Sequence, residues 1–212
     1  MTDKFEINNK TSESACLTDG DNLANLTSDL FIRVQSGDVC AFEKVVRLSA
    51  RPLFRFLFRM VRNKDQAEDI VQETFLKTYL AIDQYDPKKA SSSTWIFRIA
   101  HNLAIDYMRK PSTKMFWGKM DSFDENPNLD MPYSEETARD FVMKNELSEV
   151  LSQAIDKLPD KFREVFSLVE EQGLTYSEAA LVCKCREGTI KSRLFRAKEL
   201  IRISLAQHLD EL

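Results

Sequence analysis

A cationic stripe near the end of the chain carries the residue types best suited to contacting DNA. Between positions 186 and 202 there are six Lys or Arg residues and two acids, although the whole chain of 212 residues has a net charge of −4. Lysine and arginine neutralise phosphates, arginine also reads guanine edges, and an apolar ring can meet a thymine methyl. The candidate contact residues are Thr189, Lys191, Ser192, Arg193, Phe195 and Arg196. The stripe predicts binding in the major groove, against the alternative of an ordinary solvated helix face.

An apolar arc in the same segment indicates the helix that must position these side chains. Four residues recur at helical spacing and fall on one face, namely Ile190, Leu194, Ala197 and Ile201. Upstream, Thr175 or Ser177 can cap a shorter helix, and Glu178 stands where a capping box needs it. The apolar residues available to pack this helix against the second are Leu174, Ala179, Ala180 and Val182. The pattern predicts a helix-turn-helix over about 175–194.

The first half of the chain is predicted to fold as a separate helical unit. Positions 41–60 repeat apolar residues at helical spacing, and Pro52 is expected to break or kink that segment. Asn63 begins a turn and an N-cap, from which a further helix runs. Its inward residues are predicted to be Ala67, Ile70, Val71, Phe75 and Leu76. Its acids at positions 68, 69 and 73 are expected on the wet side, where the simple interpretation is a solvated face.

A third helix follows a loop over positions 84–94 that is rich in Ser, Lys and Pro. Its predicted core face comprises Ile96, Ile99, Ala100, Leu103 and Tyr107, and its opposite face comprises Arg98, His101, Asn102, Ile105 and Arg109. Between positions 88 and 110 there are five Lys or Arg residues and one acid. Basic and amide groups beside aromatic rings suit single-stranded DNA, because phosphates are neutralised and unstacked bases rest on the rings.

Several motifs in order along the chain resemble those of group 4 (extracytoplasmic function, ECF) RNA polymerase sigma factors. The matching segments are Gly37-Asp38 with Ala41-Phe42, Ala67–Leu76, Trp95–Asn102 with Asp106 and Arg109, Leu158–Phe166, and Gly188–Ala197. The resemblance runs from about Asp29 to Leu209. It implies region 2 and region 4 domains, promoter-specific initiation and promoter melting.

The resemblance also implies roles for individual residues. The helix with Glu68, Asp69, Gln72 and Glu73 would dock on the clamp helices of the largest subunit of core RNA polymerase. The promoter −10 element would be contacted by Tyr85, Lys88, Trp95, Arg98, Asn102 and Arg109, with the 85–94 loop and Asn102 lining a pocket for a flipped base. For Trp95 a core position is the alternative, because a large aromatic at the first turn of a helix is core at least as often. The cationic stripe would read the −35 element, and its domain would dock on the polymerase flap. An anti-sigma factor is a further implied partner.

Composition supports an all-α protein of two small helical domains joined by a flexible linker. We expect an acidic, disordered extension over 1–30, region 2 over 31–111, an acidic linker over 112–140 and region 4 over 141–212. The extension and the linker each carry −4, which leaves +4 for the two domains. Acidic flanks should weaken binding to free DNA, as suits a protein that acts when polymerase holds its domains apart.

Cysteine and histidine usage argues against a metal site or an enzyme. Cys183 and Cys185 lack the C-x2-C spacing of zinc sites, and His101 and His208 are far apart in sequence. Cys183 is expected to be a small buried hydrophobe, and Cys16 has no evident role. No catalytic triad, phosphate loop or carboxylate pair is evident, so we expect no cofactor and no enzymatic activity. The lack of a signal segment or a long apolar run predicts a cytoplasmic protein with reduced cysteines.

Two other classes of protein remain as alternatives. A sigma-like decoy would bind an anti-sigma factor instead of promoters, but it would not need the cationic stripe. An ordinary transcription regulator would pair the helix-turn-helix with an effector-binding half, but positions 41–110 show no ligand-pocket pattern.

Overall fold

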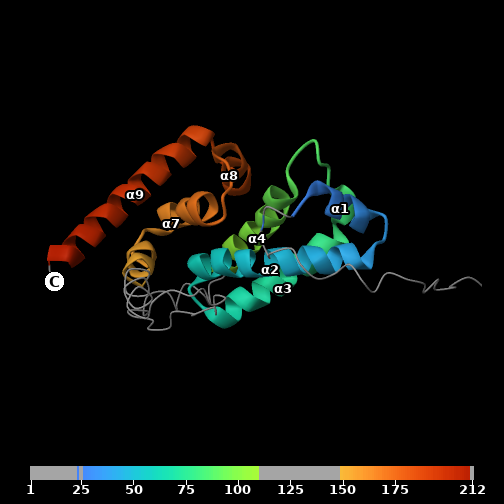
Figure 1. The fold of residues 1–212 in the computed structure, drawn as a ribbon, viewed down its shortest axis with the longest axis horizontal. Helices are drawn as coiled ribbons and strands as arrows, with labels where there is room; N and C mark the ends of the chain where they lie inside the picture. Colours follow the sequence, from blue (N-terminus) through green and yellow to red (C-terminus); the bar gives the residue numbers. More distant parts are fainter. Residues whose placement is uncertain (1–22, 24–25, 110–148, 211–212) are drawn as a thin grey trace, which may run out of the picture.

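The computed structural model describes residues 23, 26–109 and 149–210, and every regular element among these residues is helical (Figure 1). In chain order the elements are α1 (Ser28–Gln35), α2 (Val39–Val61), α3 (Lys64–Leu80), the 3-10 turn η2 (Ile82–Gln84), α4 (Ser92–Arg109), α7 (Asp160–Phe166), the π-helical turn η3 (Ser167–Glu171), α8 (Tyr176–Cys183) and α9 (Glu187–Asp210). Residues 149–156 are also helical. The predicted all-α class is confirmed.

Short polar side chains begin the two central helices of the first domain. The Asp38 carboxylate accepts a hydrogen bond of 3.0 Å from the Ala41 amide at the start of α2. Asn63 accepts one of 2.9 Å from the Gln66 amide at the start of α3, as the sequence predicted. Between them, Arg62 takes a left-handed conformation with φ of 50°, which ends α2 and turns the chain into α3.

Helix α2 continues through Pro52, which is buried inside it. Of the break or kink expected there, the break is therefore absent from this helix. A second prediction about the first domain is wrong. Leu76 is 58% exposed although it was expected to point inward. The buried stripe of α3 instead consists of Ala67, Ile70, Thr74 and Thr78. Thr74 can take an interior position because its hydroxyl donates to the Ile70 carbonyl at 2.7 Å, which satisfies its polar atom.

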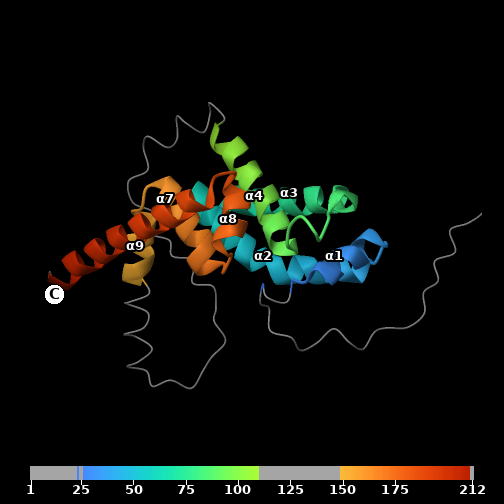
Figure 2. The ribbon, with the colours of Figure 1, turned by 90° about the horizontal axis from the view of Figure 1, so that it is seen from above.

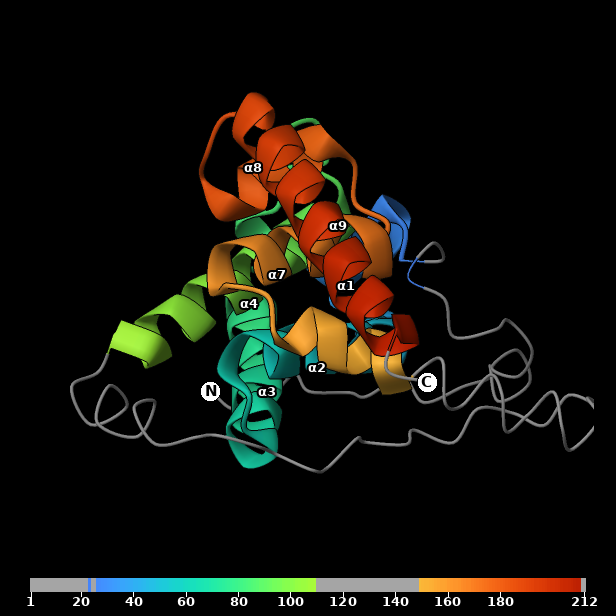
Figure 3. The same cartoon turned by 90° about the vertical axis from the view of Figure 1, so that its left-hand side faces the viewer.

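The second domain consists of residues 149–156, α7, η3, α8 and the long helix α9. In Figure 3 α9 crosses in front of α7 and rises to α8, with all three above α2 and α3. A small core joins the start of this domain to the middle of α9 and comprises Ala154, Ile155, Leu158, Ala197 and Ile201. The other buried apolar residues of α7, α8 and α9 join the core of the first domain, namely Val165, Ala179, Ala180, Val182, Ile190 and Leu194.

The two domains pack directly on each other. Helix α4 contacts α8, and α2 contacts α7, which agrees with their positions in Figures 1 and 2. Arg163 is 1% exposed, and its Nε donates to the Arg59 carbonyl of α2 at 2.6 Å. Arg59 itself pairs with Asp156 at 2.6 Å and with Glu171 at 3.3 Å. Charged and polar groups therefore supply much of this interface, around a shared apolar centre.

The first domain begins before the predicted boundary. Helix α1 begins at Ser28 and Leu26 is buried, so folded structure starts a few residues before the expected position 31. The predicted linker, and nearly all of the predicted extension with Cys16, lie outside the described residues. Among the described helices, none is long and apolar enough to cross a membrane.

Candidate nucleic-acid interface

Helix α8 begins with a complete capping box. The Thr175 hydroxyl accepts a hydrogen bond of 3.3 Å from the Glu178 amide, and the Glu178 carboxylate accepts one of 3.0 Å from the Thr175 amide. These contacts satisfy backbone donors that a helix start otherwise leaves unpaired, and they confirm the predicted cap. Helix α8 ends at Lys184, whose left-handed backbone (φ of 52°) turns the chain toward α9. The predicted helix-turn-helix is therefore present.

The orientation of α9 follows from its apolar arc, as the sequence predicted. Ile190, Leu194 and Ala197 are 0%, 3% and 0% exposed. Ile190 and Leu194 belong to the core that also contains Leu174, Ala179, Ala180 and Val182. Because one face of α9 is held inside, the residues between these positions must face outward.

Five of the six predicted −35 residues gather around one hollow of about 780 Å³. The lining residues from α9 are Gly188, Lys191, Ser192, Arg193, Phe195 and Arg196, and Phe162 of α7 completes it. Thr189 is half-buried and lies outside this set. The structure thus brings cations, a hydroxyl and an apolar ring together on one open surface, which is the mixture a major-groove contact requires.

Phe195 and Lys191 on this surface differ in their surroundings. Phe195 is 63% exposed, so its ring is available to an apolar partner. The Lys191 ammonium lies 2.7 Å from the Glu187 carboxylate and 5.6 Å from the centre of the Tyr176 ring. The hydrogen bond to Glu187 raises the pKa of Lys191 and restrains its side chain.

The two aromatic residues predicted at the −10 element are buried. Tyr85 is 4% exposed and Trp95 is 6% exposed, and their ring centres lie 5.6 Å apart. Phe31 covers both rings, with centre distances of 4.9 Å to Tyr85 and 5.7 Å to Trp95. The Tyr85 hydroxyl also bonds to Ser28 at 2.8 Å. In this arrangement both rings belong to the core, and a base could not stack on them.

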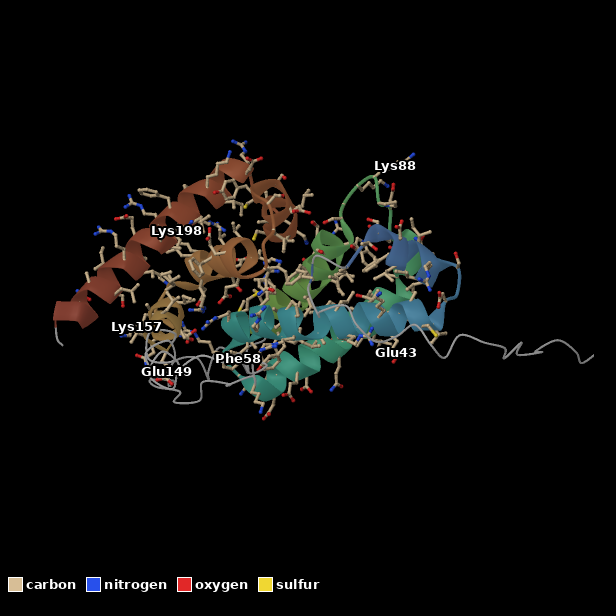
Figure 4. The ribbon with its side chains drawn as sticks, in the orientation of Figure 1. Glu43, Phe58, Lys88, Glu149, Lys157 and Lys198 are labelled. Carbon is tan, nitrogen blue, oxygen red and sulfur yellow. The ribbon has the colours of Figure 1, made fainter. Side chains whose placement is uncertain are left out.

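The other predicted −10 residues lie nearer the surface. Asn102 and Arg109 line a cleft of about 560 Å³ between the domains, and Arg193 of α9 lines the same cleft. Arg98 is half-buried, and Lys88 is exposed on the loop before α4, which projects away from the helices (Figure 4). The structure therefore places Asn102 and Arg109 together, and Lys88 apart from them.

The predicted polymerase-docking face of α3 is fully accessible. Its candidate residues Glu68, Asp69, Gln72 and Glu73 are all exposed. Beyond them, Leu76, Tyr79 and Leu80 are 58%, 50% and 72% exposed, so an apolar patch continues the acidic face. Sequence reasoning missed this patch. The sequence did contain a signal for it. Thr74 and Thr78 stand at helical spacing with Ala67 and Ile70, and these four residues fill the buried stripe of α3, which leaves Leu76 and Leu80 outside.

His101 and Asn102 are neighbours on α4 but have different surroundings. Although His101 was placed on the outer face by the sequence, it is only 7% exposed, because the second domain packs on α4 through α8. Its Nε2 lies 2.7 Å from the Glu164 carboxylate. Burial raises the pKa of Glu164, but hydrogen bonds from His101 and Cys183 and the charge of Arg193 outweigh it and hold the pKa below its ordinary value.

The carboxylate of Glu178, in the second domain, bonds to residues of the first domain near the start of α4. The Glu178 carboxylate accepts hydrogen bonds of 2.6 Å from Ser91 and 3.1 Å from Thr94. Burial raises the pKa of Glu178, and the hydrogen bonds from Ser91, Thr175 and Thr94 together lower it below its ordinary value. The carboxylate is therefore the favoured form in this position.

Together the fold and this surface define a two-domain helical protein with a helix-turn-helix suited to DNA. The sigma-70 region 2 family model matches residues 45–113, and the sigma-70 region 4 model matches residues 148–201. The ECF RNA polymerase sigma factor SigW of Bacillus subtilis is 34% identical over 178 residues, covering 82% of this chain and 93% of SigW. The ECF RNA polymerase sigma-E factor of Escherichia coli is 33% identical over 182 residues, with coverages of 83% and 93%.

Solved structures agree with these matches. The sigma factor RpoE of Bartonella quintana, in complex with the anti-sigma factor NepR, aligns with a TM-score of 0.61 and 26% identity over 79% of this chain and 98% of RpoE. The chain belongs to the ECF family of sigma-70 factors, which direct promoter recognition by RNA polymerase and are not enzymes. The predicted family, fold and general function are therefore confirmed.

Proposed function

We propose that this sigma factor reads a −35 element with α9 and a −10 element with α4, and that it assists promoter melting on core RNA polymerase. The observation that supports this most is the hollow on α9, where Lys191, Arg193, Phe195 and Arg196 surround an open surface. The buried arc of the same helix presents these side chains outward without help from a partner. Arginine in such a position reads guanine edges, and Phe195 suits a thymine methyl.

In region 2, we assign −10 contacts to Asn102, Arg109, Arg98 and Lys88. Asn102 supplies amide groups that can hydrogen-bond a flipped base, and the cations neutralise phosphates of the melted strand. Tyr85 and Trp95 support the loop before α4 from beneath, since their rings are buried against Phe31. A direct stacking role for either ring would require that loop to rearrange.

Docking on the polymerase clamp is assigned to the outer face of α3. Acidic side chains at its start and the exposed Leu76, Tyr79 and Leu80 at its end form one continuous surface. Exposed apolar side chains beside charges are typical of a protein-binding site. We assign docking on the polymerase flap to region 4. The proposed location of the protein is the cytoplasm, where core polymerase works.

The described packing of the domains must open before both elements can be bound. Asn102 and Arg193 line one cleft, whereas two elements 25 base pairs apart are separated by about 85 Å of B-DNA. Residues 110–148 could span at most about 130 Å when extended, which is enough for the separation. We propose that the free protein keeps its domains closed. We also propose that an anti-sigma factor binds this chain away from polymerase.

Transcription from a pool of randomised promoters, with core polymerase in the presence and absence of the protein, tests the proposal. We expect selected transcripts that share a −35 and a −10 element. Binding to core polymerase without initiation would identify a decoy, and absence of core binding would contradict the docking surface on α3.

A further inference from the structure

Three side chains of the types that bind zinc meet at the boundary between the domains. The three residues are His101 of α4, Glu164 of α7 and Cys183 of α8. Each offers one ligand atom, and these three atoms lie within 4.8 Å of one another. His101 is more than nine-tenths buried, and its Nδ1 has no hydrogen-bond partner among the described residues. Helices α4 and α8 pack against each other, and Glu164 brings α7 to the same place through His101. Sequence spacing gave no sign of the cluster, because its members come from three separate helices.

The spacing of these atoms is close to what zinc requires. Bonds of about 2.0–2.3 Å in a tetrahedron place neighbouring ligand atoms about 3.3–3.8 Å apart. The His101 Nε2 and Glu164 oxygen are 2.7 Å apart and would separate slightly as the metal replaces the proton between them. The third ligand atom, the Cys183 sulfur, would move inward by about 1 Å. The adjoining cleft, of about 560 Å³ and lined by all three residues, supplies an entry path and room for a water as fourth ligand.

We propose that His101, Glu164 and Cys183 form a zinc site that joins region 2 to region 4. Imidazole, carboxylate and thiolate are all established zinc ligands. Because His101 belongs to one domain and the other two ligands belong to the other, the site exists only while the domains are packed together. A bound ion therefore stabilises the closed arrangement by mass action.

Binding of a divalent cation at this cluster requires release of the Cys183 thiol proton. Burial and the charge of Glu164 raise the pKa of the Cys183 thiol, so the thiol is neutral when no metal is bound. Metal binding displaces the thiol proton to solvent, and the His101 ring coordinates through Nε2 with its N–H at Nδ1. The thiolate and Glu164 then balance the two charges of the ion. Arg193, which lines the same cleft, would face a neutral centre instead of a cation.

Titration of the full chain with Co²⁺ after chelator treatment tests the site. A thiolate bound to Co²⁺ gives a charge-transfer band in the near ultraviolet, and we expect this band to saturate at one ion per chain and to disappear when Zn²⁺ is added. Cys183→Ser should abolish the band, whereas Cys16→Ser and Cys40→Ser should leave it unchanged. His101→Gln should weaken binding by at least about tenfold.

Folding of the variants needs its own control. Glu164→Gln keeps the shape of the side chain and an oxygen that can accept from His101, yet removes the anionic ligand, so it should fold normally and bind Co²⁺ weakly. Circular dichroism of the metal-free proteins checks this. Zn²⁺ should raise the melting temperature of the wild type and not that of Cys183→Ser. Absence of Co²⁺ binding, or a thiolate band that persists in Cys183→Ser, would overturn the proposal, and neither result depends on promoter recognition.

Discussion

Arg59 in α2 and Asp156 in the second domain form an ion pair of 2.6 Å across the domain boundary. Arg59 also donates to Ser152 at 3.2 Å, and its backbone carbonyl accepts from Arg163 at 2.6 Å. With the Glu171 pair at 3.3 Å, one residue of region 2 is thus held by four residues of region 4. Because the Arg59 side chain is 16% exposed, these contacts are better shielded from water than an ordinary surface pair.

Replacing Arg59 should loosen the closed arrangement. We expect Arg59→Ala to lower the free energy of unfolding by about 1–3 kcal/mol, since charged hydrogen bonds at a partly buried site are lost. Urea unfolding measures this loss, and small-angle X-ray scattering should show a larger radius of gyration. The exposed Arg55 on the same helix provides the matched control Arg55→Ala. Equal effects of the two changes would show that the interdomain pair contributes nothing specific.

Arg193 and Arg196 should carry selectivity at the −35 element. If each makes a base contact, its replacement by alanine should cost about 1–3 kcal/mol of binding and relax selectivity at one base pair. Transcription from a set of single-base −35 variants provides the measurement. Lys198→Ala is the control, because Lys198 lies on α9 but pairs with Glu170 at 2.8 Å and is absent from the hollow. A loss that is uniform across all −35 sequences would instead identify a phosphate contact.

Asn102 should affect the −10 element without affecting assembly. We expect Asn102→Ala to reduce discrimination among −10 sequences while leaving the affinity for core polymerase unchanged, because α3 and α4 present different surfaces. Tyr85→Phe is an informative comparison, since it removes only the hydroxyl bonded to Ser28. That variant should lose about 1 kcal/mol of stability and keep its selectivity. Parallel loss of selectivity and core binding in Asn102→Ala would point to misfolding.

The apolar end of α3 should contribute to polymerase binding. Leu80 is 72% exposed, so Leu80→Ala should change the free energy of unfolding by less than about 0.5 kcal/mol. Its affinity for core polymerase should fall by roughly tenfold, equivalent to about 1.4 kcal/mol, if the side chain is buried on docking. Competition binding against the wild type measures the affinity. Ile203→Ala, at another exposed apolar position, is the control and should bind core polymerase normally.

Acid should loosen the contact between the domains. The pKa values of Glu164 and Glu178 are both below the ordinary value of 4.5 in the folded protein. Their contribution to stability is therefore complete well above pH 4.5, and it is lost as the pH falls through the lower folded values. Hydrogen exchange of α4 and α8 between pH 6 and pH 3.5 should show protection falling with acid. Glu178→Gln should flatten part of this dependence; an unchanged profile would contradict the assignment.

Local sequence patterns predicted local structure well in this protein. The capping box at Thr175, the N-cap at Asn63 and the buried arc of α9 each depend on residues within a few positions of one another, so spacing alone reveals them. Leu76 was misplaced because leucine is assumed to be interior, whereas Thr74 satisfies its hydroxyl on its own helix and takes that place.

Contacts between residues far apart in the sequence could not be predicted from local spacing. His101 was assigned to an outer face because nothing in its neighbourhood reveals that the second domain would pack on α4 through α8. For the same reason the cluster with Glu164 and Cys183 was missed, Tyr85 was expected to be available to DNA, and the choice for Trp95 between DNA and the core was left open. Their burial depends on Phe31, which precedes them by more than 50 residues.

The carboxylate of Glu178 divides its two oxygens between the domains. Oε2 closes the start of α8 with Thr175, and Oε1 accepts from Ser91 and Thr94 of region 2. When the domains separate, only the second set of bonds is exchanged for water, and the cap of α8 stays intact. Region 4 can thus be undocked and docked again with its DNA-reading helices already folded, so each cycle repeats a rigid-body step instead of a refolding step.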